Sequence, residues 1–106
     1  MEMQDKHNIS LLRLKGKLDF TTSTEFEQKF NIMINEGGKK FIFDLSEVDY
    51  MSSAGLRLLL IATKKTKGSI VLNGVRDSVK QVIEIAGFLS MFQFSSDIDE
   101  AAKLLS

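Results

Sequence analysis

Ser52 and Ser53 are the residues of this 106-residue chain whose type and place best suit a specific chemistry. They stand directly before a leucine-rich run, so the sequence predicts a helix that begins at these serines and ends near Lys67. The unpaired N–H groups and the dipole at a helix N-terminus favour an oxygen acceptor or an anion. Two interpretations stay open: one hydroxyl caps the helix, which contributes about 1 kcal/mol, or one hydroxyl carries a phosphate.

A phosphate at the start of this helix would be compatible with a folded domain. It adds about two negative charges, and the N-terminus of a helix stabilises negative charge. Phosphorylation of Ser53 could therefore change the surface of the domain without unfolding it. A protein-binding switch requires this combination.

The predicted helix also carries more apolar residues than a core-facing stripe needs. Its basic residues lie together on one narrow arc: Arg57, Lys64 and Lys65. A surface helix buries an apolar stripe of about 100° or somewhat more, so we expect Leu56, Leu60 or Ile61 to be partly exposed at its margin. Neighbouring elements could cover that margin, or it could be an apolar patch with a basic border that docks another protein.

The sequence offers little for catalysis or for a metal. It has no cysteine and one histidine, His7, close to an N-terminus that we expect to fray. A Ser/His/Asp triad around Ser53 and a multi-histidine metal site are therefore not predicted. The sequence has no glycine-rich phosphate loop of the Walker type either. The segment Gly74–Asp77 is typical of a strand-to-helix turn. We predict a protein that is not an enzyme and has no cofactor, while weak nucleotide binding near Ser53 stays open.

The charge pattern argues against nucleic acid and membrane as partners. Fourteen basic residues balance fourteen acidic ones, and the chain has neither a dense basic run nor a lysine-rich amphipathic helix. The longest apolar run, Leu58 to Ala62, is far too short to span a bilayer. The opening residues, Met1 to Lys6, lack the apolar segment of a signal peptide. A cytoplasmic location is the resulting expectation.

Hydrophobic periodicity and turn residues predict an α/β chain organised as one domain over residues 1–106. The expected strands are Asn8–Lys15, Lys17–Phe20 paired with it as a hairpin or bulge, Phe41–Leu45, Ser69–Asn73 and Phe92–Phe94, with a loop over Ser46–Met51. The other expected helices follow the capping cluster Thr21–Thr24 as far as Gly37, cover Asp77–Ala86, and start at Ser96 or Asp97. Strands and helices alternate from residue 20 onward, which favours a sheet with a parallel portion and helices packed on it.

An ordered set of motifs resembles a known bacterial family. The motifs are Gly16-Lys-Leu-Asp19, Phe41-Ile-Phe-Asp-Leu-Ser46, Val48-Asp-Tyr-Met-Ser-Ser-Ala-Gly-Leu56, Gly68 before Ile70-Val-Leu-Asn73, and Gly87-Phe-Leu89 before Phe92. Over nearly the whole chain they are similar to STAS domains of the anti-sigma factor antagonist type. The resemblance implies a mixed sheet of about five strands with about four helices packed mainly on one side.

The resemblance also implies a partner-switching function in transcription regulation. In this family the unphosphorylated antagonist binds a partner that is both a serine kinase and an anti-sigma factor, and this frees a sigma factor. Phosphorylation of a serine at the start of the second helix breaks the complex, and a separate serine phosphatase reverses it. We expect a monomer that forms hetero-complexes. Isolated STAS-like domains also act as docking subunits of transport or stress-sensing assemblies without a phosphate cycle, and that alternative stays open.

The family's phosphorylated segment usually reads Asp-Ser-Ser/Thr-Gly-Leu, and its first serine accepts the phosphate. Alignment on Gly55-Leu56 places this acceptor at Ser53. The chain departs from the family pattern at two positions, because Ser52 replaces the aspartate and Ala54 replaces the second hydroxyl residue. The resemblance therefore implies Ser53 as the phosphorylation site, with Ser52 as the alternative.

Two aspartates also correspond to positions of interest. Asp19 matches the family's acidic position in the loop after the N-terminal strands, but it could also be a solvated turn residue or a helix cap. Asp44, at the end of its predicted strand, is expected to organise the next loop through side-chain to backbone hydrogen bonds. The predicted partner-binding residues are Asp19, Thr21, Ser52, Ser53, Gly55, Leu56, Arg57 and Leu60.

Overall fold

The structure is a computed structural model that describes residues 2–6 and 8–106, with side chains described from Asn8 onward, so that His7 lies outside the described residues. Its strands are β1 (Glu2–Lys6), β2 (Ile9–Leu18), β3 (Lys40–Met51), β4 (Ile70–Asn73) and β5 (Gln93–Ser95). Its helices are α1 (Phe20–Asn35), α2 (Ser53–Lys65), α3 (Asp77–Ile85), the 3₁₀ turn η1 (Leu89–Met91) and α4 (Ile98–Leu105).

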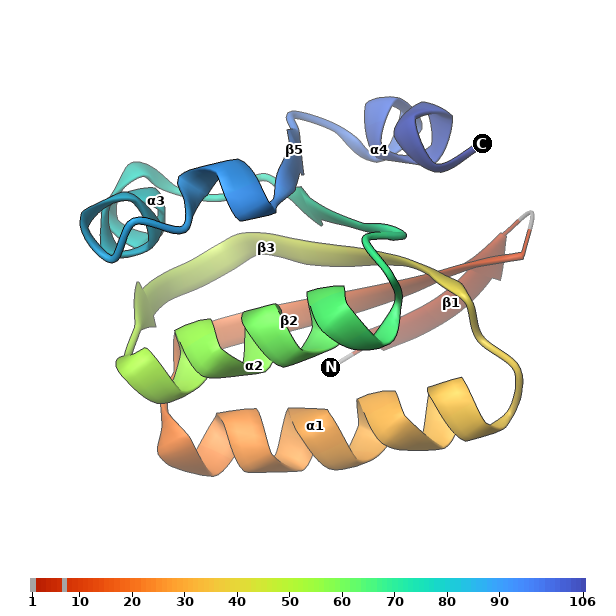
Figure 1. Cartoon of the computed structure of the whole chain (residues 1–106), viewed down its shortest axis with the longest axis horizontal. Coiled ribbons are helices and arrows are strands. Elements are labelled where there is room, and N and C mark those ends of the chain that lie inside the picture. Colours follow the sequence, from red (N-terminus) through yellow and green to blue (C-terminus); the bar gives the residue numbers. More distant parts are fainter. Residues whose placement is uncertain (1, 7) are drawn as a thin grey trace.

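The five strands form one sheet in the order β1-β2-β3-β4-β5. Strands β2 to β5 are parallel to one another, and β1 is antiparallel to β2. Parallel neighbours need a crossover connection, and α1, α2 and α3 supply these connections in turn. The predicted α/β architecture with a parallel portion is confirmed (Figure 1).

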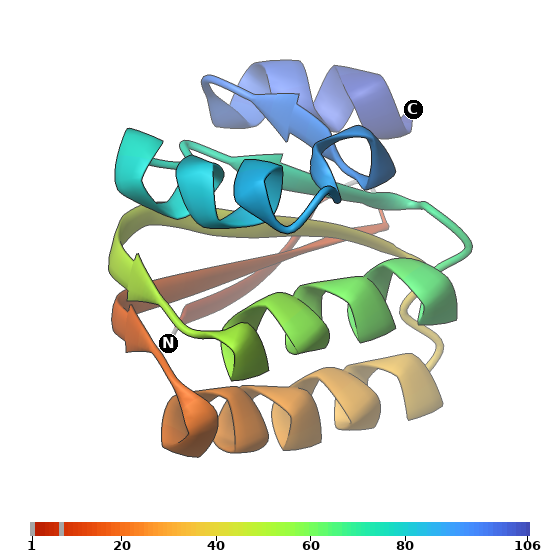
Figure 2. The ribbon, with the colours of Figure 1, turned by 60° about the vertical axis from the view of Figure 1, so that its left-hand side comes forward.

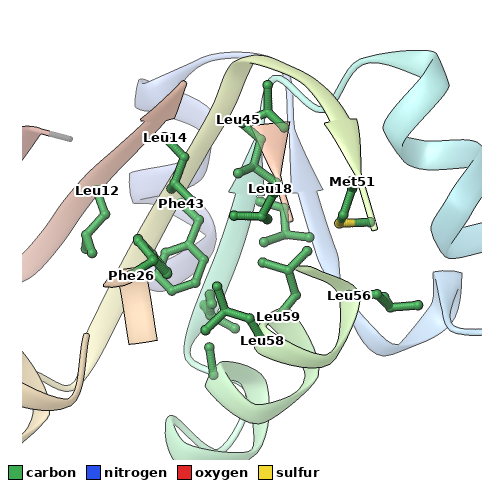
Figure 3. Packing of buried hydrophobic residues seen from close by; sticks show 14 of the residues in the cluster. Leu12, Leu14, Leu18, Phe26, Phe43, Leu45, Met51, Leu56, Leu58 and Leu59 are labelled. Carbon is green, nitrogen blue, oxygen red and sulfur yellow. The ribbon is translucent and has the colours of Figure 1, made fainter. Parts of the chain in front are cut away.

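Alternate residues along the strands build two separate cores, because successive strand side chains point to opposite faces. On one face, residues such as Leu12, Phe43 and Leu45 pack with side chains of α1, α2 and α3 (Figure 3). On the other face, Leu11 and Ile42 pack against α4. Three helices thus cover one face and a single short helix covers part of the other, in agreement with the expected arrangement (Figure 1).

Aromatic packing holds α1 on the sheet. Phe26 and Phe30, predicted on one face of this helix, are fully buried against Phe41 and Phe43 of β3. The ring centroids of Phe26 and Phe43 are 4.9 Å apart and edge-on, as are those of Phe30 and Phe41. Pairs of this kind contribute about 0.5–1.5 kcal/mol beyond the burial of their area. The helix ends where expected, at Gly37, whose φ of 101° continues the chain in a left-handed turn.

The N-terminal strands correspond to the bulged alternative of the prediction and not to the hairpin. The expected second strand Lys17–Phe20 does not turn back as a hairpin: β2 continues through Gly16 to Leu18, and its antiparallel partner is β1, in the segment that was expected to fray. Gly16 has a φ of 78°, and the pairing of β2 with β3 shifts register on either side of it. Each shift places one extra residue on β3, so the chain does not reverse at Gly16 but runs on opposite two irregularities of β3, since an extra residue bends a strand without ending it.

The expected loop Ser46–Met51 and the expected helix cap also need correction. The loop is instead the second half of β3, which pairs with the end of β2 in a shifted register and buries Val48 and Met51. The shift disturbs the alternation of apolar and polar residues, so no strand period is visible there. Helix α1 begins at Phe20, before the capping cluster Thr21–Thr24, because Asp19 is its N-cap.

Candidate functional site

Strand β3 ends at Met51 and α2 begins at Ser53, so Ser52 is the N-cap of a helix that starts at the carboxyl end of a parallel strand. The Ser52 hydroxyl oxygen accepts the Gly55 N–H at 3.4 Å, and the Ser52 carbonyl accepts the Leu56 N–H at 3.1 Å. The predicted helix start at the two serines is confirmed. Figure 2 shows the first turns of α1 and α2 at the same end of the molecule.

Ser52 also joins the start of α2 to the end of β2. Its backbone N–H donates to the Leu18 carbonyl at 3.0 Å, and its hydroxyl donates to the same oxygen at 3.3 Å. Gly55 permits this approach, because a Cβ at that position would lie 2.6 Å from the Leu18 oxygen and 2.7 Å from Met51 Cγ. Since Asp19 follows Leu18 directly, the starts of α1 and α2 form one continuous surface.

Asp19 caps α1 with a reciprocal pair of hydrogen bonds. Its carboxylate accepts the Thr22 N–H at 3.1 Å, and its own N–H donates to Thr22 Oγ1 at 2.9 Å. The hydrogen bond from the Thr22 backbone, followed by that from the Thr22 hydroxyl, holds the pKa of Asp19 below its ordinary value of 3.8, although partial burial opposes this shift. Asp19 is therefore an ionised helix cap beside Ser53, which confirms one of the roles considered for it.

The two candidate phosphate acceptors differ in accessibility. Ser53 is the first residue of α2, its side chain is exposed, and its hydroxyl makes no hydrogen bond with any residue that the structure describes. Ser52 is half-buried, and its hydroxyl both accepts from Gly55 and donates to Leu18. The Ser53 hydroxyl is thus free to meet another molecule, whereas that of Ser52 is engaged in holding two elements together.

Arg57 stands one turn beyond Ser53 on α2, and its side chain is exposed. Residues separated by four positions are neighbours on the surface of a helix. Arg57 makes no ion pair with the described residues, so its guanidinium is available to an anion attached to Ser53 or to an acidic group of a partner. A serine hydroxyl and a guanidinium side by side at a helix N-terminus can hold a phosphate.

The other predicted partner-binding residues separate into exposed and buried ones. Thr21 is exposed on the first turn of α1, and Leu60 is half-buried, as is Ile61. Gly55 and Leu56 are buried, with 7% of Leu56 exposed. The expected apolar margin of α2 is therefore confirmed at Leu60 and Ile61, whereas Leu56 belongs to the core and can act on a partner only through the position of α2.

Two exposed aromatic residues lie beside the site and are missing from the predicted set. Phe20, directly after Asp19, is 75% exposed, and Tyr50, two residues before Ser52, is 50% exposed. In the sequence Phe20 is typical of a strand end and Tyr50 of a loop. The signal that could have identified Phe20 as the first residue of a helix is Asp19, because aspartate is a favoured N-cap.

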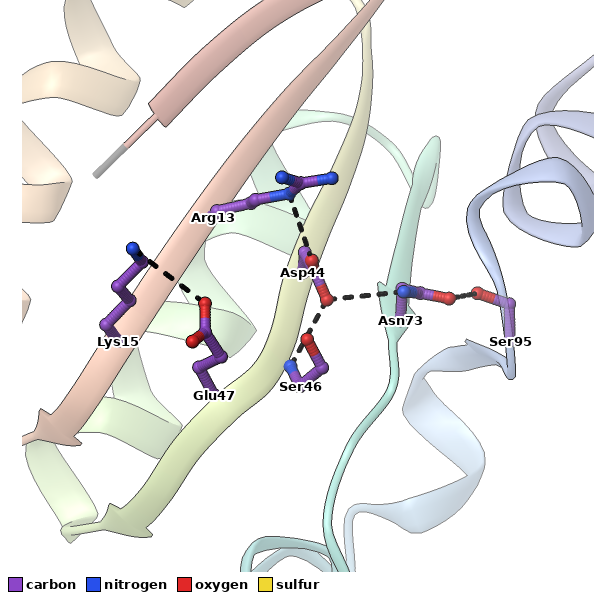
Figure 4. Close-up of polar contacts among 7 residues, drawn as sticks. All are labelled: Arg13, Lys15, Asp44, Ser46, Glu47, Asn73 and Ser95. Atoms are coloured by element: carbon purple, nitrogen blue, oxygen red, sulfur yellow. Dashed lines mark hydrogen bonds and ion pairs between the residues drawn. The ribbon is translucent and has the colours of Figure 1, made fainter.

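Below the site, a row of polar side chains crosses the sheet (Figure 4). The Asp44 carboxylate pairs with Arg13 Nε at 3.2 Å and accepts from Asn73 Nδ2 and from the Ser46 N–H, each at 3.2 Å. The amide oxygen of Asn73 accepts from the Ser95 hydroxyl at 2.8 Å. Asp44 therefore makes the expected hydrogen bond to the backbone, within a strand rather than a loop. It links β3 to β2 and β4, and the bond between Asn73 and Ser95 extends the row to β5.

The described part of the chain holds no group of three or more histidine, cysteine, aspartate or glutamate side chains arranged for a metal ion. Among those same residues, no helix combines the length and apolar character needed to cross a bilayer. The features available for chemistry at this end of the molecule are therefore a free serine hydroxyl, an ionised aspartate, an exposed arginine and two aromatic rings.

Comparisons with known proteins agree with this architecture. The family model of the STAS domain matches residues 1–101 of the sequence. The candidate anti-sigma factor antagonist BtrV of Bordetella bronchiseptica is 33% identical over 92 residues, which cover 84% of this chain and 79% of BtrV. The anti-sigma-B factor antagonist of Staphylococcus aureus is 30% identical over 79 residues, covering 72% of this chain and 73% of that protein.

Solved structures share the fold at lower identity. A candidate anti-sigma factor antagonist of Thermotoga maritima superimposes with a TM-score of 0.90 at 18% identity, covering 98% of this chain and 92% of the other. The chain belongs to the STAS-domain family, and within it to the anti-sigma factor antagonists. These antagonists are regulators without enzymatic activity, which confirms the prediction that the chain is not an enzyme.

Proposed function

We propose that this chain antagonises an anti-sigma factor that is also a serine kinase, and that phosphate on Ser53 ends their association. The observation that carries the proposal is the exposed, unengaged hydroxyl of Ser53 at the first position of α2. In the proposed step the kinase transfers the γ-phosphoryl group of ATP to Ser53 Oγ. The O–P bond to ADP breaks, the new O–P bond forms, and the hydroxyl proton leaves with a base of the kinase.

The fold supports a phosphate at Ser53 without rearrangement. The N–H groups of Ser53 and Ala54 are the first two of α2 and have no carbonyl within the helix to bond. Arg57 is four residues on and exposed. A phosphate would therefore gain charge-assisted hydrogen bonds on this chain itself, which stabilise the phosphorylated form.

The same contacts explain why a partner would leave. The docking surface consists of Ser53, Arg57, Leu60, the Asp19–Thr21 turn and Tyr50, so it combines apolar groups with both signs of charge. A dianion on Ser53 would take Arg57 away from an acidic group of the partner and would place two further charges beside ionised Asp19. A close interface then has to desolvate this charge or separate from it. A serine phosphatase would restore the original surface.

The decisive experiment compares two variants of Ser53 in binding to the serine kinase encoded by the same genome, using calorimetry. Ser53→Ala should bind in the presence of ATP and should not be released. Ser53→Asp should bind at least about tenfold more weakly than wild type, because a fixed charge at the centre of an interface opposes docking. Mass spectrometry of wild type after incubation with kinase and ATP should find the phosphate on the peptide 48–57, at Ser53.

Ser78→Asp is the matched control. Ser78 is also exposed in the first turn of a helix, α3, so the variant adds the same charge in an equivalent place. It should bind as wild type does. Equal affinities of Ser53→Ala and Ser53→Asp would contradict the proposal. Recovery of an ATPase subunit of a transport system instead of a kinase in a pull-down would favour the alternative, a docking subunit without a phosphate cycle.

A further inference from the structure

A hollow lies at the end of the molecule opposite Ser53. It has a volume of about 410 Å³ and is found where α1 and α2 end and β3 and β4 begin. Figure 2 shows the connections from α1 to β3 and from α2 to β4 at that end, away from the first turns of the two helices. Since α2 has 13 residues, this hollow and the Ser53 surface are separated by roughly 20 Å along the helix.

The hollow is basic. Its lining residues are Ile34, Gly38, Lys39, Lys65, Thr66, Lys67 and Ser69, and none of them is acidic. Lys40 and Lys64 adjoin it in sequence, which brings five lysines to this end of a chain whose formal net charge is zero. The one acidic residue of the neighbouring turn is Glu36, which is exposed.

These positive charges are not compensated within the described residues. The five lysines make no ion pair there, and the one hydrogen bond of their ammonium groups runs from Lys65 Nζ to Asn31 Oδ1 at 2.6 Å. Lysines in the last turn of a helix favourably oppose its dipole, and this accounts for Lys64 and Lys65. It does not account for Lys39 and Lys67, which lie outside the helices and face the same hollow.

The backbone determines which anion would suit this place. The N–H groups at the turns are already used, since Gly38 donates to the Met33 carbonyl and Gly68 to the Thr63 carbonyl. An anion would therefore be held by side chains, chiefly the ammonium groups, with the Ser69 hydroxyl as one further donor. Lysine is a flexible point charge with three donors, which suits several separated carboxylates better than one tightly enclosed phosphate.

The lining also disfavours other polyanions. It contains no aromatic side chain on which the bases of single-stranded nucleic acid could stack. It is concave and has one large apolar side chain, Ile34, whereas a protein that lies on a membrane presents an apolar face rich in leucine and aromatic residues. A peptide with carboxylates at intervals matches the separated positive charges of the lining.

We propose that this basic hollow is a second docking surface, which takes an extended acidic segment of another protein. It is independent of the Ser53 surface, because the separation of roughly 20 Å exceeds the screening length of about 8 Å at physiological salt. One partner could then hold the chain while another is bound and released at Ser53. The proposal does not depend on phosphorylation of Ser53.

The test uses a fluorescently labelled hexaglutamate peptide and measures its anisotropy with the whole chain. Wild type should bind the peptide, and more tightly at about 0.05 M than at about 0.15 M salt, because screening weakens exposed charge pairs. Lys39→Glu combined with Lys67→Glu should weaken binding at least about tenfold. Both lysines are exposed, so the fold should be retained; the pair Lys39→Gln and Lys67→Gln serves as a milder version.

Lys17→Glu combined with Lys103→Glu is the matched control, since it changes the net charge equally with exposed lysines elsewhere. It should stay within about threefold of wild type, and Ser53→Asp within about twofold, as expected of distant independent sites. Equal losses in the two lysine pairs, or no binding of the peptide, would overturn the proposal. Tighter binding to anionic vesicles or to a single-stranded oligonucleotide than to hexaglutamate would do the same.

Discussion

Asp19 and Ser52 are the two residues whose small side chains make the site possible. Each caps a helix, and Ser52 in addition bonds to the carbonyl that immediately precedes Asp19. The neighbouring hydroxyl of Ser53 is exposed because Ser52 fulfils the cap. Ser52 therefore caps the helix, and the hydroxyl of the adjacent Ser53 remains free for a partner or a phosphate.

The lowered pKa of Asp19 predicts a pH-dependent contribution to stability. A carboxyl group whose pKa is lower in the folded state stabilises the fold above its ordinary value, 3.8, and loses that effect as the pH falls through the folded pKa. Asn can still accept the Thr22 N–H but carries no charge. Asp19→Asn should therefore unfold at lower urea than wild type at neutral pH, and the difference should shrink as the pH falls below the ordinary pKa of 3.8.

The control for this prediction is Asp49→Asn, at an exposed position of β3 without an ion pair among the described residues. Its unfolding midpoint should stay close to that of wild type at both pH values. A difference between Asp19→Asn and wild type that is the same at neutral and acid pH would mean that the charge of Asp19 does not matter.

At the scale of elements, α1 presents two phenylalanines in opposite environments. Phe26 is fully buried against Phe43, whereas Phe20, in the first position of the same helix, is 75% exposed. Phe20 is therefore not held in place by the core. Its ring contributes little to the stability of the fold and belongs to the docking surface that we propose around Ser53.

Phe26→Ala and Phe20→Ala should accordingly differ widely in stability. The first should lower the free energy of unfolding by about 3–5 kcal/mol, because it removes a packed ring and leaves a cavity. The second should change it by less than about 0.5 kcal/mol. Urea denaturation followed by circular dichroism measures both, and Phe26→Leu replaces Phe26→Ala if the latter does not fold. Similar losses for Phe20→Ala and Phe26→Ala would show that α1 is packed differently.

At the scale of the whole molecule, the row of polar side chains from Arg13 to Ser95 joins residues that are far apart in the sequence. Asp44 is its centre, and 7% of this residue is exposed. The Lys15–Glu47 pair on the same two strands has 3.9 Å between its charged atoms, and both side chains are more than half exposed. Buried polar groups are costly when left unpaired, whereas exposed ion pairs contribute little.

Asp44→Ala should therefore lower the free energy of unfolding by about 2–3 kcal/mol, since it leaves Asn73 and the Ser46 N–H without their acceptor. The partial exposure of Arg13 keeps the loss below that of a fully buried pair. Glu47→Ala should cost less than about 0.5 kcal/mol. Chemical denaturation of both variants at neutral pH checks this, and equal losses would refute a structural role for the row.

Local signals identified most elements correctly. The apolar period of α1 around Phe26 and Phe30, the turn at Gly37, and the serines before α2 depend on residues close together in the chain. The predictions were wrong where the structure of a segment depends on its pairing with residues far away in the sequence. Whether the chain reverses at Gly16 or continues depends on the pairing of β2 with β3, and the second half of β3 is a strand because it continues that pairing in a shifted register.

Residue types in order along the chain were enough to predict the α/β class, the helix start at Ser52 and Ser53, and the family. Tertiary packing determines which serine is free, because the Leu18 carbonyl that engages Ser52 comes from another strand. It likewise exposed Phe20 and gathered Lys39 and Lys67 around one hollow. Accessibility and the convergence of charge are properties of the surface, and the surface exists only once distant segments have packed.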